Sequence, residues 1–265
     1  MTRAVADWDP ALYTRFEDER TRPAADLLGR VALDAPRLAY DLGCGPGNST
    51  ELIVRRFPDA EVVGLDTSAA MLDSARRRLP ALRFEAADAA TWVPGRAPDL
   101  IFANAVLQWL PGHADLLPRL FGLLAPGGVL AVQMPDNLAE PSHRLMREVA
   151  AAGPWAAAIG DPAVAGRLGR MLSVDAYYDA LAPLAAEVDV WRTAYQHRMD
   201  DAAAIVEWVS ATGLKPFTDP LPPDLKAGFL DAYAHAIDGG YPARADGRRL
   251  LAFPRVFIVA RRAAA

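Results

Sequence analysis

Three glycines follow the first apolar segment of the chain at alternate positions. They lie in the stretch DLGCGPG, directly after the apolar residues 38–42, and are Gly43, Gly45 and Gly47. Glycine is needed where a backbone turns sharply and passes too close to a ligand for a Cβ atom. With Asp41 and Cys44 of the same stretch, these glycines predict a cofactor-binding turn between a buried strand and a helix.

The spacing of the glycines separates two classes of cofactor. A dinucleotide fingerprint, GxGxxG, would place its third glycine at position 48, where this chain has Asn48. The shorter GxGxG spacing favours S-adenosylmethionine over NAD. A nicotinamide-dependent oxidoreductase stays an alternative, although the chain has no Tyr-x-x-x-Lys pair to support it.

Further polar residues follow the next predicted strands. Asp66 comes 19 residues after Gly47, where its carboxylate can accept both hydroxyls of a ribose. Asp88 is placed to accept from an adenine amino group, and Asn104 is a polar interruption in an apolar run, so it needs a ligand or backbone partner. The predicted cofactor contacts therefore comprise these three residues, the glycine turn with Asp41 and Cys44, and the neighbours Thr67 and Ala89.

Short apolar segments alternate with helical ones in the first half of the chain. Strands are predicted at 38–42, 61–65, 82–85, 99–103 and 128–134, and this alternation is typical of a parallel, doubly wound α/β sheet. After Pro135 the segments are mostly helical, with further strands predicted at 187–195 and 253–260. We therefore expect a single domain over 1–265, with helical cap or lid insertions at about 138–182 and 200–248.

The composition limits the possible partners and location of the protein. The net charge of −5 argues against a general nucleic-acid binder, which would be basic. No signal peptide and no apolar run of about 18 residues is evident, so no membrane is expected, and the single Cys44 fits a cytoplasmic protein. The four histidines show no zinc-binding spacing, so no metal is expected.

Beyond the glycine motif, the chain resembles the trans-aconitate 2-methyltransferases, a family of class I S-adenosylmethionine-dependent methyltransferases. The likeness runs from Asp7 to Arg262. It includes the segments DWDPALYTRF (7–16), ERTRPAADLL (19–28), DLIFANAVLQWLP (99–111), GGVLAVQMPDN (127–137), VDVWRTAY (188–195), VSATGLKP (209–216) and LLAFPRVFIVARR (250–262).

The resemblance implies a Rossmann-like sheet of seven mostly parallel strands and methyl transfer from S-adenosylmethionine to a carboxylate of trans-aconitate. The products would be a monomethyl ester and S-adenosylhomocysteine. A carboxylate is already ionised at pH 7, so no catalytic base is expected, and proximity and orientation carry the reaction. The expected partner is a small tricarboxylate, and the protein is expected to be a monomer or a weak homodimer.

A tricarboxylate needs its other carboxylates fixed, and the planar fork of arginine can bind them in pairs. The chain holds 26 arginines and only 2 lysines, so the abundance of arginine does not by itself indicate a functional site. Candidates are therefore taken from the family-specific segments, with two aromatic side chains as pocket walls: Tyr13, Arg20, Arg22, Trp109, Arg192 and Arg255. The arginines of the N-terminal helix could equally hold the methionine carboxylate of the cofactor.

Two further alternatives remain open at this point. The same fold and cofactor could serve another acceptor, such as a different carboxylate, a carbon or a nitrogen. The chain could also be a binding protein that keeps the fold without catalysis.

Overall fold

The computed structural model describes residues 17–165, 171–210 and 213–265, with side chains from residue 21 onward. The chain forms two compact units. Unit 1 takes its described residues from the ranges 1–135, 170–192 and 256–265, and unit 2 from 136–169 and 193–255.

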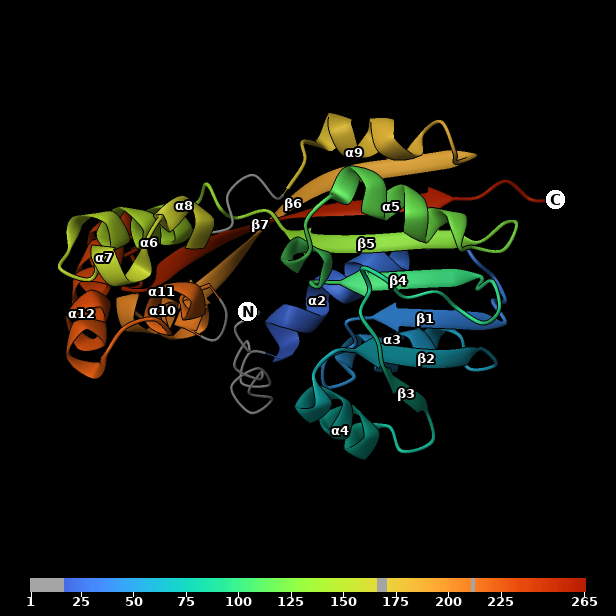
Figure 1. Cartoon of the computed structure of the whole chain (residues 1–265), viewed down its shortest axis with the longest axis horizontal. Coiled ribbons are helices and arrows are strands. Elements are labelled where there is room, and N and C mark those ends of the chain that lie inside the picture. The colour runs from blue at the N-terminus through green and yellow to red at the C-terminus, as the bar shows by residue number, and fades with distance from the viewer. Residues whose placement is uncertain (1–16, 166–170, 211–212) are drawn as a thin grey trace. The chain divides into compact units, whose positions relative to one another are not determined.

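Seven strands form one sheet in the order β3-β2-β1-β4-β5-β7-β6 (Figure 1). Neighbouring strands from β3 to β5 are parallel. Arg262 donates to the carbonyl of Gly128, and Asp136 donates to that of Pro254, so β7 runs antiparallel to β5. The strands are β1 (Leu38–Leu42), β2 (Glu61–Asp66), β3 (Arg83–Ala86), β4 (Leu100–Asn104), β5 (Val129–Pro135), β6 (Glu187–Met199) and β7 (Arg249–Arg261).

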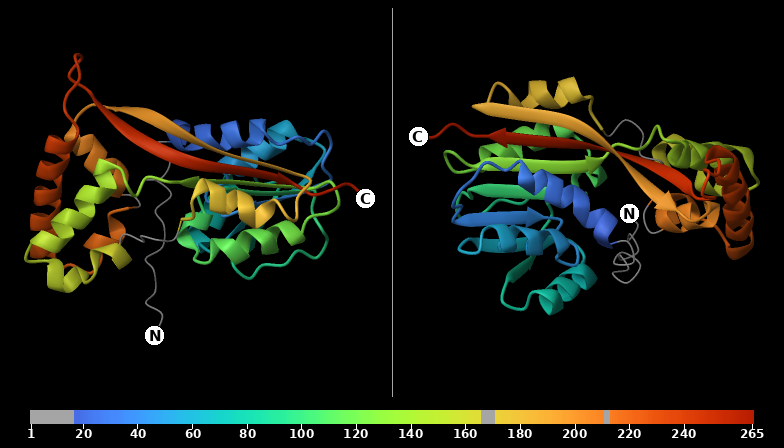
Figure 2. Two further views of the ribbon diagram at one scale, coloured as in Figure 1. Left: turned by 90° about the horizontal axis from the view of Figure 1, so that it is seen from above. Right: turned by 180° about the vertical axis from the view of Figure 1, so that it is seen from behind.

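Helices cover both faces of the sheet in unit 1. Helices α2 and α3 lie on one face, and α5 and α9 on the other, as seen from above in Figure 2. The second pair packs on a core of apolar strand residues that includes Leu42, Ile101 and Val132. The helices of this unit are α2 (Glu17–Gly29), α3 (Asn48–Arg56), α4 (Ala69–Arg78), the 3-10 turn η1 (Leu107–Trp109), α5 (His113–Gly122) and α9 (Val174–Leu181).

Local sequence explains where the first elements begin and end. All five residues of β1 are buried, which fits a central strand covered on both faces. Helix α3 begins after Gly47 and ends before Pro58, which cannot continue it. Helix α4 begins after Ser68, whose hydroxyl accepts a 3.2 Å hydrogen bond from the amide of Met71.

Unit 2 is mainly helical and is held by buried tyrosines. Tyr233 donates from its hydroxyl to the carbonyl of Ser142, and the amide of Ser142 donates to the hydroxyl of Tyr241, both at 3.0 Å. These bonds join the start of α6 to α12 and the residue after it. The helices of this unit are α6 (Pro141–Ala152), α7 (Ala156–Ile159), α8 (Pro162–Ala165), α10 (Ala202–Ser210), α11 (Lys215–Thr218) and α12 (Pro223–Gly240).

The predicted seven-stranded, mostly parallel sheet is confirmed, and the last two strands are longer than expected. β6 continues to Met199 because His197 and Met199 extend the alternation of buried and exposed residues beyond Tyr195. β7 begins at Arg249 instead of Phe253. The single domain with two insertions stays a prediction. No helix within the described ranges is long and apolar enough to cross a membrane.

Candidate active site

The glycine turn joins β1 to α3 with a backbone that favours glycine. The φ angles of Gly43, Gly45 and Gly47 are 64°, 53° and 94°, in the left-handed region. A Cβ atom on Gly43 would lie 2.3 Å from a methyl carbon of Val106, so no side chain fits there. A Cβ atom on Gly45 would meet no atom within 4 Å. The turn is thus packed against the protein at residue 43 and open at residue 45.

Asp66 connects the glycine turn to the end of the second strand. One carboxylate oxygen accepts a 2.9 Å hydrogen bond from the amide of Gly45, and the other accepts a 2.8 Å bond from the amide of Ser68. A carboxylate has about four acceptor positions, so these two bonds leave room for a ligand hydroxyl. The side chain therefore orients the turn and remains able to bind a ribose.

Asp41 lies beneath the turn and is fully buried. One of its carboxylate oxygens accepts hydrogen bonds from the hydroxyls of Ser49 at 2.7 Å and Thr50 at 2.6 Å. Burial raises the pKa of Asp41 to about 7, and nearby Asp66 raises it further, while the two hydroxyl bonds oppose the shift. Asp41 thus fixes the first turn of α3 and has a proton affinity unusual for a carboxyl group.

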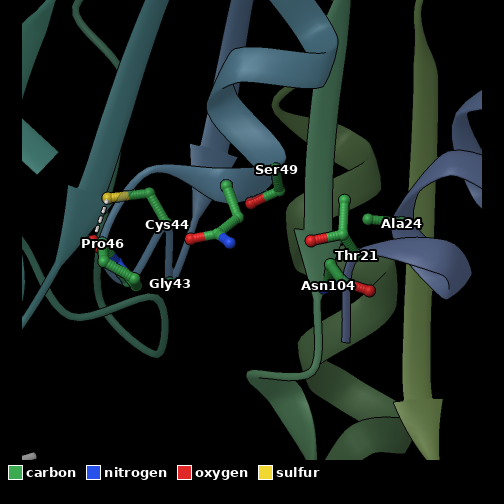
Figure 3. A pocket seen from close by; sticks show the side chains of 9 residues that line it. Thr21, Ala24, Gly43, Cys44, Pro46, Ser49 and Asn104 are labelled. Carbon is green, nitrogen blue, oxygen red and sulfur yellow. Dashed lines mark hydrogen bonds between the residues drawn. The ribbon is translucent and has the colours of Figure 1, made fainter. Parts of the chain in front are cut away.

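A pocket opens where the glycine turn, helix α2 and the end of β4 meet. Its empty space, including the mouth open to solvent, amounts to about 330 Å³. Figure 3 shows side chains from three elements, with Thr21 on α2, Ser49 on α3 and Asn104 at the end of β4. The lining residues are Thr21, Ala24, Gly43, Cys44, Gly45, Pro46, Asn48, Ser49 and Asn104.

The residue that follows Asn104, the pocket residue at the end of β4, has a strained backbone. Ala105 has a φ of 55°, which is rare for a residue with a Cβ atom. Its amide donates to the carbonyl of Gln133 at 2.9 Å, and its carbonyl accepts from the side-chain amide of Gln108 at 2.7 Å. These bonds hold Asn104 toward the pocket and Val106 against Gly43.

A buried histidine supports the 3-10 turn that follows. His113 is bonded through Nδ1 to the hydroxyl of Tyr177 at 2.7 Å and through Nε2 to the carbonyl of Leu107 at 2.9 Å. His113 and Tyr177 expose 2% and 0% of their surface. The half-buried Trp109 ends this turn and does not line the pocket.

The pocket collects part of the predicted cofactor contacts. Gly43, Cys44, Gly45 and Asn104 line it, and the side chains of Asp66 and Asp41 bond to its wall residues. Gly47 ends the turn, and Thr67 follows Asp66. Asp88 is exposed next to Ala89, and its carboxylate accepts from the amide of Ala90 at 2.8 Å. All of these stay predicted contacts.

The predicted acceptor ligands that the structure describes lie on different elements and are divided between the two units. Arg22 is exposed on α2, while Tyr13 and the side chain of Arg20 lie outside the described residues. Arg192 is exposed at the end of the part of β6 that belongs to unit 1. Arg255, in unit 2, is 4% exposed, and its guanidinium carbon lies 4.9 Å from the ring centre of Phe253 and 5.9 Å from that of Tyr195.

Five residues that line the pocket were not predicted from the sequence, and three of them are polar, namely Thr21, Asn48 and Ser49. Thr21 lies between the two arginines proposed for the N-terminal helix, and its side chain carries no motif of its own. In the sequence, Asn48 stands where the dinucleotide motif has its third glycine and lies near the start of the predicted helix. Its position directly after Gly47, at the start of the predicted helix, was the one available signal for a side chain beside the turn.

Comparison with known proteins agrees with this geometry. The family model "Methyltransferase domain" matches residues 40–130, from β1 to the start of β5. The crystal structure of the YcgJ protein from Bacillus subtilis is similar with a TM-score of 0.58 at 12% identity, covering 92% of this chain and 100% of that chain. The seven-stranded fold, the matched domain and the relatives described next make this chain a class I S-adenosylmethionine-dependent methyltransferase.

Two relatives of known name identify the family within this class. The trans-aconitate 2-methyltransferase of Methylobacterium radiotolerans is 82% identical over 98% of this chain and 100% of its own length. That of Paracidovorax citrulli is 67% identical over 97% of this chain and 99% of its own length. The chain belongs to the trans-aconitate 2-methyltransferase family. The resemblance read from the sequence is confirmed, and the nicotinamide-dependent alternative is excluded.

Replacing Gly43 by alanine should destabilise the protein. The new Cβ atom would collide with Val106 and oppose a positive φ, so Gly43→Ala should lower the free energy of unfolding by about 2 to 4 kcal/mol in urea denaturation. Gly247→Ala is the matched control, because Gly247 has a φ of 81° but no atom near its Cβ position. Gly247→Ala should lower the free energy of unfolding by only about 1 kcal/mol. Equal losses would contradict the role given to Val106.

Replacing Asp41 by asparagine should change how stability depends on pH. Between about pH 4 and pH 7 the folded protein keeps a proton on Asp41 that the unfolded chain has released, so raising the pH destabilises the wild type. The stability of Asp41→Asn relative to wild type should therefore rise across this range, by up to about 1.4 kcal/mol per pH unit. This difference in the free energy of unfolding is measured by denaturing both proteins at several pH values. Asp59→Asn serves as the control, because Asp59 is exposed. A constant difference would refute the raised pKa.

Proposed function

We propose that this protein transfers the methyl group of S-adenosylmethionine to a carboxylate of trans-aconitate, which gives the monomethyl ester and S-adenosylhomocysteine. The observation that carries the proposal is the 82% identity, over nearly the whole chain, to a relative named trans-aconitate 2-methyltransferase. The identity extends through both units, and the described pocket lies in unit 1.

The residues at the pocket fit the proposed cofactor. Gly45 leaves open space where any other residue would place a Cβ atom. Asp66 ends the neighbouring strand with a carboxylate that can accept ribose hydroxyls, and Asn104 presents an amide on the other side of the turn. When bound, S-adenosylmethionine supplies a methyl group made electrophilic by its sulfonium sulfur. Asp41, Cys44, Gly47, Thr67, Asp88 and Ala89 complete the proposed cofactor contacts.

The attacking carboxylate needs no activation. The task left to the chain is therefore to bind and orient the acceptor. A carboxylate with an ordinary pKa near 4 is ionised at neutral pH, so no side chain has to remove a proton. The work of the protein is to bring the attacking oxygen in line with the methyl group and to exclude water. No catalytic base is therefore assigned.

Arginines are proposed to hold the remaining carboxylates. The guanidinium of Arg255 lies near the rings of Phe253 and Tyr195, and such packing occupies its faces, whereas carboxylates bind at its edge. The proposed acceptor contacts are Arg255 together with Tyr13, Arg20, Arg22, Trp109 and Arg192. The substrate is a small molecule, and its two carboxylates that are not methylated would be held by members of this group of four arginines. A monomer or weak homodimer is the proposed assembly.

Methyl transfer is tested directly with S-adenosylmethionine labelled in the methyl group. Incubation with trans-aconitate should give a labelled, base-labile monomethyl ester together with S-adenosylhomocysteine. A panel of other di- and tricarboxylates, amines and carbon acceptors runs in parallel. Turnover of an amine or carbon acceptor alone would refute the ester assignment, and binding without any turnover would indicate a non-catalytic protein.

Arg255→Lys should weaken binding of the acceptor and leave binding of the cofactor nearly unchanged. Lysine keeps the charge but loses the planar fork, so the KM for trans-aconitate should rise at least tenfold while the KM for S-adenosylmethionine changes less than twofold. Arg248→Lys is the matched control in the same unit, since Arg248 pairs with Asp200 and Asp246 on the surface. An equal rise in both KM values would contradict acceptor binding by Arg255 and indicate a structural role.

A further inference from the structure

Four ring-bearing side chains form one buried cluster in unit 2, here called the aromatic cluster. Tyr195 and His197 come from β6, Phe253 comes from β7, and Trp208 comes from α10. None of the four exposes more than 8% of its surface. β6 and β7 are neighbours in the sheet, and residues two apart along a strand share a face, so the cluster occupies one face of this strand pair.

The rings of the aromatic cluster contact one another at defined angles. The ring centre of His197 lies 4.7 Å from that of Trp208 and 5.8 Å from that of Phe253. Phe253 and Trp208 meet edge to face, with their ring centres 5.9 Å apart and their planes at 66°. Tyr195 is stacked beside His197 at 6.4 Å. In such close packing no ring can turn without displacing its neighbours, so each ring has a fixed orientation.

A charged side chain is packed against this cluster. Arg255 follows Phe253 on the same face of β7 and exposes only 4% of its surface. Its guanidinium carbon lies over the ring of Phe253 at 4.9 Å and over that of Tyr195 at 5.9 Å. A guanidinium packs on rings through its flat faces and donates hydrogen bonds within its own plane. The two rings therefore fix the plane in which Arg255 can donate.

Packing alone does not explain an arginine at this position. The other residues from Leu250 to Ala260 are apolar or proline, and an aliphatic side chain would fill the same space without burying a charge. A second group of rings in unit 2, which includes Trp155 and Phe229, packs without a cation over its faces in the described part of the chain. A buried guanidinium with a fixed plane thus indicates a ligand-binding function.

The orientation of this plane matters for an acceptor with several carboxylates. Methyl transfer requires the attacking oxygen to lie in line with the methyl group, so the carboxylate that is presented in this way is the one esterified. A carboxylate bound to the edge of a guanidinium lies in the guanidinium plane. A fixed plane therefore gives the whole acceptor one orientation, whereas a mobile guanidinium allows more than one.

We propose that the aromatic cluster determines which carboxylate of the acceptor is methylated, because it fixes the plane of Arg255. Phe253 acts on the guanidinium directly, and Trp208 acts through Phe253, so both are positioning residues. The proposal rests on the reaction given above and on acceptor binding by Arg255, and it adds a determinant of regiospecificity to that site.

The test identifies the monomethyl esters that Phe253→Leu and Trp208→Leu produce, by NMR of the isolated product. The wild type should give a single ester. Each variant should give a second regioisomer, about a tenth of the product or more, and a KM for trans-aconitate raised about three- to tenfold. The KM for S-adenosylmethionine should change less than about twofold. Trp208→Phe keeps a ring against Phe253 and should restore the single ester.

Phe229→Leu is the matched control in the same unit. Phe229 is fully buried, and its ring centre lies 5.5 Å from that of Trp155 and 6.3 Å from that of Phe217. This variant should lower the Tm as Phe253→Leu does, because both leave a cavity in a packed group of rings. It should still form the single ester with an unchanged KM for trans-aconitate.

The outcomes separate this inference from the proposed function. If the wild type forms no ester of trans-aconitate, the function itself is wrong. If the wild type forms one ester and both leucine variants form that ester alone, only the inference is overturned. A second ester from Phe229→Leu would likewise overturn it, because any loosening of unit 2 would then have the same effect. Should Phe253→Leu not fold, the two Trp208 variants decide by the same measurements.

Discussion

The contact between Gly43 and Val106 sets the positions of the two sides of the pocket. Gly43 begins the turn after β1, and Val106 follows the strained Ala105 after β4, with no space between them for a single additional carbon. The strained segment is held in place by two hydrogen bonds, one from the amide of Ala105 to the carbonyl of Gln133 and one from the side chain of Gln108 to the carbonyl of Ala105. The turn after β1 and the segment after β4 are therefore packed directly against each other at this point. The proposed cofactor contacts thus depend on a steric constraint that involves no charged group.

The polar groups around the turn divide into those that build it and those that remain unsatisfied. Asp66 and Asp41 build it, since their carboxylates bond to Gly45, to Ser68 and to the hydroxyls of α3. Asn48 and Asn104 hold buried atoms for which the described chain offers no partner. The first group explains why the turn has its shape without a ligand. The second indicates what a ligand would supply, and both groups line the same pocket or bond to its wall residues.

The sequence predicted the fold and the glycine turn because both depend on local patterns. Apolar runs that end in glycine or aspartate marked the parallel strands, and the end of β4 at Asn104 followed from a polar residue that interrupts such a run. Thr21 and Asn48 could not be found in this way, because whether a buried polar atom has a partner depends on residues distant in the chain. Arg255 illustrates the same limit. Its charge within an apolar strand was visible in the sequence, whereas the rings of Phe253 and Tyr195 beside it were not.

The division of the chain into units has a consequence for how this protein can diverge. The chain passes from one unit to the other at residues 136, 170, 193 and 256, so unit 2 is encoded by two separate stretches. Both β6 and β7 include residues of each unit, so these boundaries fall inside strands instead of in loops. Exchange of one contiguous gene segment cannot replace unit 2 as a whole. A contiguous exchange that carries all of unit 2 must also carry residues 170–192 of unit 1.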